Sequence, residues 1–484
     1  MTSLYKSAKH ESKQFKSWMK QQTVASVAPA TVFKQGYAAR QMYQNLILKN
    51  PDATDAGMRA HRSLWKECFY TYISGMRAHL SASEMVTSRR PRQRLAAFID
   101  LAITYYEELF SCLQRASSKS GVADRSQSML RTLVYLGDLA RYRSRETDDG
   151  RCTDAHEFYQ RAVRAFPHDG NPHNQLAVLA TYQKFSLNAV YHYCRALTVR
   201  FPFHTARANL ERLFHKEVPG AVALAEDEIA IKRHWRECSQ SGQSVGPAQK
   251  NKMRRLLMCR FVQFHGSLLT GSMSNVGALL SDLVRIKGSL SQLLSRCFSQ
   301  NLLHHGIVLK MIVISTFSVL DMQSRKPKND DLAKFAWEAF GLLLRLMCAY
   351  VVGDIASLDT LTPQVSKRRG LKKGKGEGKG QGQGKRKGDQ AAPDLSSVLH
   401  NLTPMLRPIA IAARWVHVLH MNIGATDLNW AHCPVPIQRV ILRSLTSVVN
   451  WAKDNVLTHN KHENMHGQTA ENGMMLPEDA ELVG

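Results

Sequence analysis

Apolar side chains recur at helical spacing in almost every segment of this chain of 484 residues. Between Met58 and Leu80 they form one continuous stripe, which predicts a helix with one buried face. The stripe consists of Leu64, Cys68, Tyr72 and Met76, with Trp65, Phe69 and Ile73 beside it. The alternating pattern of β-hairpins is not evident, so we expect an all-α fold.

The length of the chain indicates more than one domain, because a typical domain has roughly 150 residues. A polar stretch rich in Gly, Ser and Pro at 239–248 marks the expected boundary. Ahead of it we expect a helical domain at 1–238, and after it antiparallel helical hairpins at 249–365 and 394–457. We expect 366–393 to be a disordered insertion and 458–484 a flexible tail.

A repeat of 34 residues lies in the middle of the chain. Ala155, Tyr159 and Ala162 recur 34 residues later as Ala189, Tyr193 and Ala196. This period is that of a tetratricopeptide repeat, which we place at about 133–215. Because two copies leave an apolar face open, we expect flanking helices, including Val218–Trp235, to cover it.

The formal net charge of +26 predicts polyanionic partners. Ser366–Gly388 alone holds ten basic residues and one acid, so nucleic acid is a possible partner of this tract. The same charge suits phosphorylated proteins, and charge alone does not choose between the two. The longest apolar stretches are interrupted by Lys310 and Arg345, so we expect buried core helices and no membrane partner.

The sequence contains no recognisable catalytic motif. The nine cysteines form no CxxC pair, which favours reduced thiols in a cytosolic or nuclear protein. We find no nucleophile elbow, phosphate-binding loop, HExxH motif or paired carboxylates on a shared helix. We therefore expect no catalytic activity, no metal site and no cofactor.

Four segments carry a resemblance to a known family, namely LWKECFYTYI from Leu64, YLGDLARYR from Tyr135, the stretch beginning FYQRAVRAFPHDGNPHNQLA at Phe158, and FPFHTARANLERLF from Phe201. They resemble the SMG/Est family of nonsense-mediated mRNA decay factors and telomerase regulators. The resemblance is specific over about a third of the chain and becomes diffuse in the C-terminal half. It implies an N-terminal 14-3-3-like domain containing tetratricopeptide repeats.

The resemblance also implies function and partners. Family members bind phosphorylated Ser/Thr motifs of a UPF-type RNA helicase in a groove lined by Arg and Lys. The implied partners are that helicase, a paralogous 14-3-3-like protein in a heterodimer, and the decay machinery. The implied location is the cytoplasm, with shuttling to the nucleus.

The candidate phosphopeptide-binding residues lie on different predicted helices. Arg141 and Tyr142 match the family's phosphate-binding Arg-Tyr pair. Arg62 and Lys66 share one face of an earlier helix, with Lys66 as a substitute for a family lysine that is replaced here by Tyr70. The other candidates are Arg145, one turn after Arg141, and Asn174, which matches a family asparagine.

Each candidate also has a purely structural interpretation. For Arg141 it is an ion pair with Asp138 three residues earlier, and for Asn174 it is satisfaction of backbone groups at a helix start. Three functions therefore stay open: a non-catalytic adaptor that binds phosphopeptides, a telomerase-associated regulator that binds single-stranded DNA or RNA, and a repeat scaffold that needs no phosphate.

Overall fold

A computed structural model describes most of the N-terminal two thirds of the chain and one later helix. The described residues are 2–22, 25–50, 55–82, 89–119, 125–147, 152–217, 221–241, 245–271, 276–325, 330–352, 408–409, 412–413 and 435–452. Within these ranges every regular element is a helix, and the only isolated β-bridge joins Asp169 to Phe201. The prediction of an all-α fold is confirmed.

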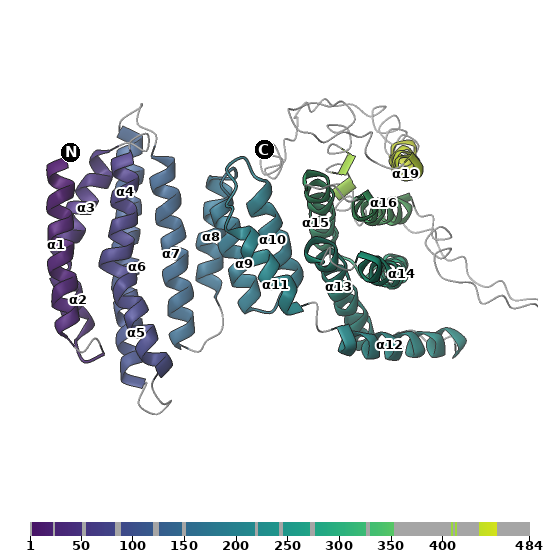
Figure 1. The fold of residues 1–484 in the computed structure, drawn as a ribbon, viewed down its shortest axis with the longest axis horizontal. Coiled ribbons are helices and arrows are strands. Elements are labelled where there is room, and N and C mark those ends of the chain that lie inside the picture. Colours follow the sequence, from purple (N-terminus) through teal and green to yellow (C-terminus); the bar gives the residue numbers. More distant parts are fainter. Residues whose placement is uncertain are drawn as a thin grey trace, which may run out of the picture. The chain divides into compact units, whose positions relative to one another are not determined.

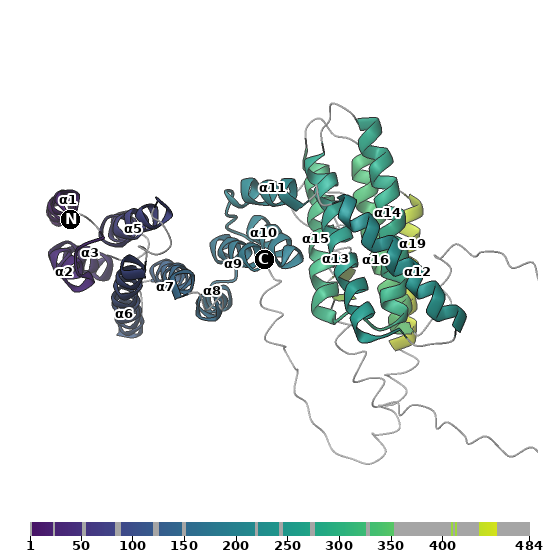
Figure 2. The same cartoon turned by 90° about the horizontal axis from the view of Figure 1, so that it is seen from below.

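The helices form two compact units, one within Met1–Asn209 and the other within Leu210–Met474. The first unit is a row of helices packed side by side (Figures 1 and 2). From α6 to α10 each helix packs on the next one in the chain, whereas α1 packs on α3 and α2 mainly on α6. Its helices are α1 Thr2–Gln21, α2 Pro29–Gln35, α3 Tyr37–Lys49, α4 Asp55–Ser63, η1 Leu64–Tyr70, α5 Thr71–Ala82, α6 Arg89–Lys119, α7 Ser126–Thr147, α8 Thr153–Ala165, α9 Gly170–Tyr182, α10 Ser186–Thr198 and the start of α11 Ala206–Glu217.

The helix expected over Met58–Leu80 contains a π-helical turn, η1, between α4 and α5. The hydroxyl of Thr71 donates to the carbonyl of Lys66, five residues earlier, at 2.6 Å. The wider turn keeps the four-residue stripe of the sequence on one buried face, which a turn of 3.6 residues would rotate away.

Buried Glu67 anchors η1 to the N-terminal helices. Its carboxylate accepts hydrogen bonds from Ser12 and from the hydroxyl of Tyr43, and it pairs with Lys9. Burial alone would raise the pKa of Glu67, but these hydrogen bonds outweigh it, and the pKa lies below its ordinary value. The charged carboxylate therefore ties α1 and α3 to η1.

The two repeats occupy α7–α8 and α9–α10. The repeated Tyr159, with the alanines on either side of it, is fully buried, and Tyr193 of the second copy is 4% exposed. Gly137 allows α7 and α8 to approach closely, because a Cβ atom there would overlap the ring of Tyr159. The expectation that these repeated residues form core is confirmed.

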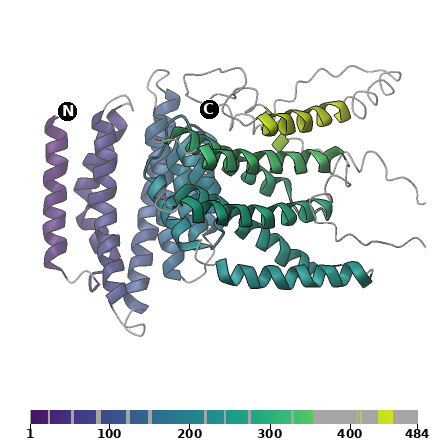
Figure 3. The ribbon, with the colours of Figure 1, turned by 45° about the vertical axis from the view of Figure 1, so that its right-hand side comes forward.

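The second unit is built from antiparallel helices in which α16 lies against α14, α15 and α19 (Figure 3). Buried Glu228 on α12 accepts from Arg260 on α13 at 3.0 Å and from Ser289 on α14 at 2.6 Å. The helices are α12 Ala221–Ser241, α13 Pro247–Thr270, α14 Val276–Ser299, α15 His305–Ser324, α16 Asp330–Val352 and α19 Val435–Ala452.

The division between the units lies ahead of the polar stretch at 239–248, because α12 packs on α13 and belongs to the second unit. Val218–Trp235 was expected to cover the repeats, and its described part instead belongs to the second unit. The insertion 366–393, the tail 458–484 and most of the expected helix 395–421 lie outside the described residues.

Helix α15 is long and apolar enough, by length and composition alone, to cross a membrane. In the structure 56% of its apolar window is buried. It also buries the polar side chains of Ser315, Ser318 and Asp321. This burial is that of a core helix.

Candidate functional site

The predicted basic residues Arg62, Lys66, Arg141 and Arg145 lie on two helical segments, α4–η1–α5 and α7, whose side chains meet. The rings of Trp65 and Tyr135 stack between the two segments, with centroids 4.5 Å apart and planes at 3°. Further along, the guanidinium of Arg77 lies 4.9 Å from the ring centroid of Tyr142. Residue numbers rise together on both sides, so the two helical segments run parallel.

Arg141 is held in place on the α7 side of this contact. Its Nη2 donates to Asp138 at 2.7 Å, and its Nε donates to the hydroxyl of Tyr159 at 3.3 Å. The Tyr159 hydroxyl in turn donates to the same Asp138 oxygen at 2.7 Å. Burial opposes the charge of Arg141, but Asp138 outweighs it, and the pKa of Arg141 is raised.

The ion pair with Asp138 expected for Arg141 is therefore present, and the side chain of Arg141 is only 8% exposed. Its third nitrogen, Nη1, makes no hydrogen bond with any described residue. Asp138 and Tyr159 thus fix the guanidinium and leave one of its donor groups unused.

A second cation, Arg77, lies close to the ring of Tyr142. The guanidinium of Arg141 lies 4.7 Å from the centroid of its ring, and Arg77 lies 4.9 Å from the same centroid. Arg77 is half-buried and has no acidic partner among the described residues. Two guanidinium groups from separate helices therefore meet at one tyrosine.

Arg77 was missed by the sequence prediction. It lies seven residues after Tyr70, so both residues are on one face of the helix that carries Lys66. This spacing was the sequence feature that could have identified Arg77 as a site residue. In the structure Tyr70 is 39% exposed, stacks on Trp65, and lies close enough to Tyr142 to raise its pKa.

The hydroxyl of Tyr142 is a proton donor in this site. Burial, followed by the charge of Asp138, raises the pKa of Tyr142 above its ordinary value, so the hydroxyl keeps its proton at neutral pH. It makes no hydrogen bond with a described residue. Arg77, Arg141 and Tyr142 together offer unused donors to one anion.

The other predicted residues are placed differently. Lys66 and Arg62 are exposed, and neither is among the groups that shift the pKa of Arg141 or Tyr142. Arg145 is exposed at the end of α7, with its guanidinium 5.5 Å from the ring centroid of Tyr182.

Asn174 lies inside the repeats. It is 4% exposed, and its side-chain oxygen accepts from Asn209 at 3.0 Å. The structure therefore brings Arg141, Tyr142 and Arg77 together, keeps Arg62, Lys66 and Arg145 at the surface, and places Asn174 in the helix packing.

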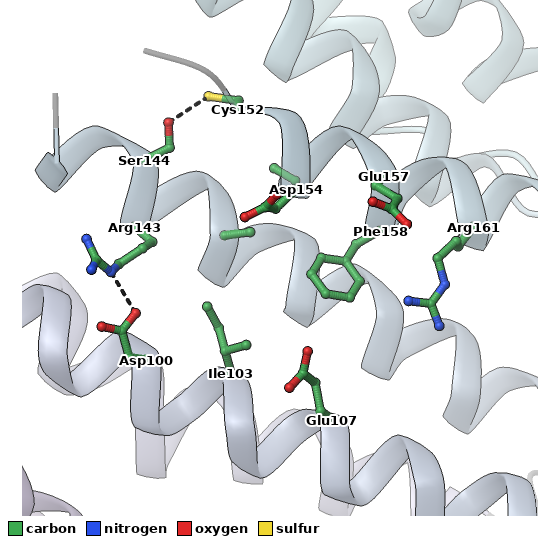
Figure 4. Close-up of a pocket in the computed structure, with 12 residues that line it drawn as sticks. Asp100, Ile103, Glu107, Arg143, Ser144, Cys152, Asp154, Glu157, Phe158 and Arg161 are labelled. Carbon is green, nitrogen blue, oxygen red and sulfur yellow. Dashed lines mark hydrogen bonds and ion pairs between the residues drawn. The ribbon is translucent and has the colours of Figure 1, made fainter. Parts of the chain in front are cut away.

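A separate cavity of about 500 Å³ lies between α6, α7 and α8 (Figure 4). Its lining includes four carboxylates and two arginines, namely Asp100, Glu107, Asp154, Glu157, Arg143 and Arg161. Arg143 is paired with Asp100 at 2.6 Å. The excess of carboxylates disfavours phosphate there, so the cluster of Arg77, Arg141 and Tyr142 is the better anion site.

Curated relatives resemble the chain over parts of their length. It is 23% identical to the nonsense-mediated mRNA decay factor SMG7 of Danio rerio over 67% of this chain and 27% of that protein. It is 28% identical to the telomerase-binding protein EST1A of Danio rerio over 36% of this chain and 12% of that protein. With SMG7 of Arabidopsis thaliana the identity is 33% over 32% of this chain and 17% of that protein. The chain thus spans about a quarter or less of these relatives.

A solved structure shares the fold. A chain from the crystal structure of Est1 and Cdc13 superposes with a TM-score of 0.53 and 12% identity, over 96% of this chain and 100% of that one. Residues 155–484 match the family described as Est1 DNA/RNA binding domain. The resemblance to the SMG/Est proteins is thereby confirmed, and the chain belongs to the Est1 DNA/RNA binding domain family.

Proposed function

We propose that this protein is a non-catalytic adaptor that binds phosphorylated Ser or Thr where Arg77 of α5 and Arg141 of α7 meet at Tyr142. The observation that carries the proposal is this pair of guanidinium groups, which lie 4.9 Å and 4.7 Å from the centroid of the Tyr142 ring. A phosphate monoester brings close to two negative charges and several acceptor oxygens. Fixed cationic donors from separate helices are what such a ligand requires.

Preorganisation supports the same proposal. Asp138 and Tyr159 orient Arg141 before any ligand arrives, so little side-chain entropy is lost on binding. The hydroxyl of Tyr142 adds a neutral donor beside the two charges. Two charge-assisted contacts contribute about 3 to 6 kcal/mol gross, at roughly 1.5 to 3 kcal/mol each.

That energy corresponds to weak binding, at about millimolar to tens of micromolar. Useful affinity then requires more than one phosphate, or a dimer that raises the effective concentration. A heterodimer with a paralogous 14-3-3-like protein is one such arrangement and is part of the proposal.

The biological ligand we propose is a phosphorylated UPF-type RNA helicase in nonsense-mediated mRNA decay. The relatives named as decay factors support this assignment, since they include SMG7 from both a fish and a plant. The adaptor would act in the cytoplasm, with shuttling to the nucleus, and would hand the bound helicase to the decay machinery.

Calorimetric titration of the full chain with a helicase peptide, phosphorylated and bare, tests the proposal. Arg77→Gln should weaken phosphopeptide binding at least tenfold, about 1.4 kcal/mol, because it removes one of the two cations. Arg77 suits this test better than Arg141, whose replacement also breaks a buried ion pair.

The matched control is Arg164→Gln, which removes the same charge from an exposed position on α8. It should leave phosphopeptide affinity unchanged, and circular dichroism should show equal helix content in both variants. Equal affinity for the bare peptide, or an Arg77→Gln variant that binds as the parent does, would contradict the proposal.

Binding of single-stranded DNA or RNA is the second candidate function. It is favoured by the description of the matched family and by the basic tract Ser366–Gly388. Nucleic-acid binding of this kind should weaken steeply with added salt and should be lost when that tract is deleted. The same titration with single-stranded RNA distinguishes the two functions.

A further inference from the structure

An open cavity of about 340 Å³ lies in the second unit, where α14, α16 and α19 meet. Helix α16 runs between the other two and packs on both (Figure 3). The volume lies within the roughly 300 to 1,000 Å³ typical of ligand pockets. Apolar side chains from α16 and α19 form part of the wall, namely Leu342, Ile437 and Val440. The cavity is therefore a candidate binding site that the phosphate-binding function does not use.

The cavity follows one face of α16. The lining residues on this helix share that face over two turns and are Glu338, Gly341, Leu342 and Arg345. Seven residues of helix cover about 10 Å, at roughly 1.5 Å per residue. At the end near Glu338, that carboxylate forms an ion pair with Lys287 of α14. Because the two charges compensate one another, this end of the cavity is close to neutral.

Gly288 of α14 leaves one wall of the cavity open. A Cβ atom at this exposed glycine would have no described atom within 4 Å. At Gly341 on α16, by contrast, a Cβ atom would lie 3.1 Å from Cγ2 of Ile437, so α16 and α19 approach closely there. Val284, one turn before Gly288, is 55% exposed and adds apolar surface on the same face of α14. A side chain from outside therefore has room beside Gly288.

Arg345 supplies the uncompensated charge of the cavity. It is half-buried at the end away from Glu338, and it makes no hydrogen bond or ion pair with any described residue. Lys287 and Glu338 neutralise one another, so the three charged lining residues leave one positive charge. A complementary ligand is apolar over most of its length and carries a negative charge near Arg345.

We propose that this cavity binds an amphipathic helix of a partner protein, with apolar side chains beside Gly288 and Leu342 and an acidic residue against Arg345. The walls are helices, whose backbone groups are bonded within each helix, so an extended peptide would find no strand edge to join. A helix satisfies its own backbone and needs only side-chain contacts. The surface is independent of the phosphate site at Tyr142.

Single-stranded nucleic acid suits this cavity poorly. Proteins hold single strands by stacking bases on aromatic side chains along a basic groove. Among the described residues that line the cavity none is aromatic, and one of its two cations is already paired with Glu338. The chemistry of the lining favours an apolar and acidic protein segment.

The experiment begins with a phage-displayed library of 16-residue peptides built from helix-forming residues, with the positions of one helical face randomised. Phage are selected on the full chain, and those that also bind the full-length Gly288→Leu variant are removed. We expect the retained peptides to carry Leu, Ile, Phe or Met three or four residues apart, with Asp or Glu one or two turns further along. One retained peptide is then synthesised with a fluorescent label and titrated by anisotropy.

Gly288→Leu should weaken this peptide at least tenfold, because the new side chain occupies the cavity. Gly277→Leu is the matched control: Gly277 is exposed on the same helix, has no described atom within 4 Å of an added Cβ, and is not among the lining residues. It should leave the affinity unchanged. Thermal unfolding should show neither variant to be less stable than the parent, because each loses a helical glycine.

A charge exchange tests the acidic contact separately. Arg345→Glu should weaken the labelled peptide at least tenfold, and a peptide with Lys in place of its acidic residue should bind Arg345→Glu more tightly than it binds the parent. Arg255→Glu, which changes an exposed residue of α13 outside the lining, should have no such effect. Arg77→Gln, which removes a cation of the phosphate site, should leave this peptide unaffected.

Three results would overturn the proposal. They are a selection that retains no peptide, retained peptides without an acidic residue, and a failure of the charge exchange at Arg345. Labelled oligouridine should bind the parent and Gly288→Leu equally. If oligouridine instead displaces the peptide and loses affinity in Gly288→Leu, the cavity belongs to nucleic acid and the proposal fails.

Discussion

At the scale of single residues, Tyr159 is the member of the repeat that links packing to the site. Its ring fills the contact between α7 and α8, and its hydroxyl accepts from Arg141 and donates to Asp138. Tyr159→Phe keeps the ring and removes both hydrogen bonds. We expect the free energy of unfolding to fall by about 1 to 3 kcal/mol, since buried charged partners lose a hydrogen bond, with weaker phosphopeptide binding.

Urea unfolding followed by circular dichroism measures this change. Tyr182→Phe is the control, because Tyr182 is 53% exposed. Loss of its hydroxyl should change the free energy of unfolding by less than about 0.5 kcal/mol. A Tyr159→Phe variant as stable as the parent would show that the hydroxyl does not hold Arg141 in place.

At the scale of elements, two helical glycines should respond oppositely to alanine. At Gly137 on α7 a methyl group would overlap the ring of Tyr159 on α8, so we expect a loss of about 1 to 3 kcal/mol. At Gly75 on α5 nothing lies within 4 Å of the added carbon, so alanine should stabilise the helix by about 0.5 to 1 kcal/mol.

Thermal unfolding of the two variants beside the parent chain tests both directions. The Gly137→Ala variant should also lose phosphopeptide affinity, because displacement of Tyr159 loosens Arg141. Two changes of the same sign would mean that helix propensity, and not the close approach of α7 and α8, decides the effect at Gly137.

At the scale of the whole molecule, both units contain histidines that are buried without charge. Burial is the main cause that lowers the pKa of His61, His173 and His265 to about 3. An unfolded chain binds these protons near pH 6.5. Stability should therefore be complete above pH 6.5 and fall as the pH drops from there towards 3, by about 1.4 kcal/mol per histidine at pH 5.5.

Unfolding at pH 7.5 and pH 5.5 measures this dependence. His265→Gln should flatten the pH dependence of the second unit, where His265 hydrogen-bonds Ser318 at 2.8 Å. Exposed His10, replaced in the same way, should leave the dependence unchanged. A stability that does not fall between these pH values would mean that the histidines take up protons in the folded chain.

The sequence alone determined the features that depend on local spacing. The helices, the 34-residue repeat and the buried Tyr159 and Tyr193 follow from periodicity, because a helix with one apolar face must bury that face. The excess of positive charge is likewise a property of composition. The π turn at Leu64–Tyr70 was not predicted, because a spacing of four residues is also that of an ordinary α-helix.

Only the tertiary structure decided which cations meet. Arg77 and Arg141 are far apart in the chain, and their approach to one ring depends on how α5 packs beside α7. The burial of Asn174 among the repeats was equally invisible in the sequence. Periodicity shows which face of a helix is buried, but the neighbour that covers that face, and so the partner of each polar side chain, is set by packing.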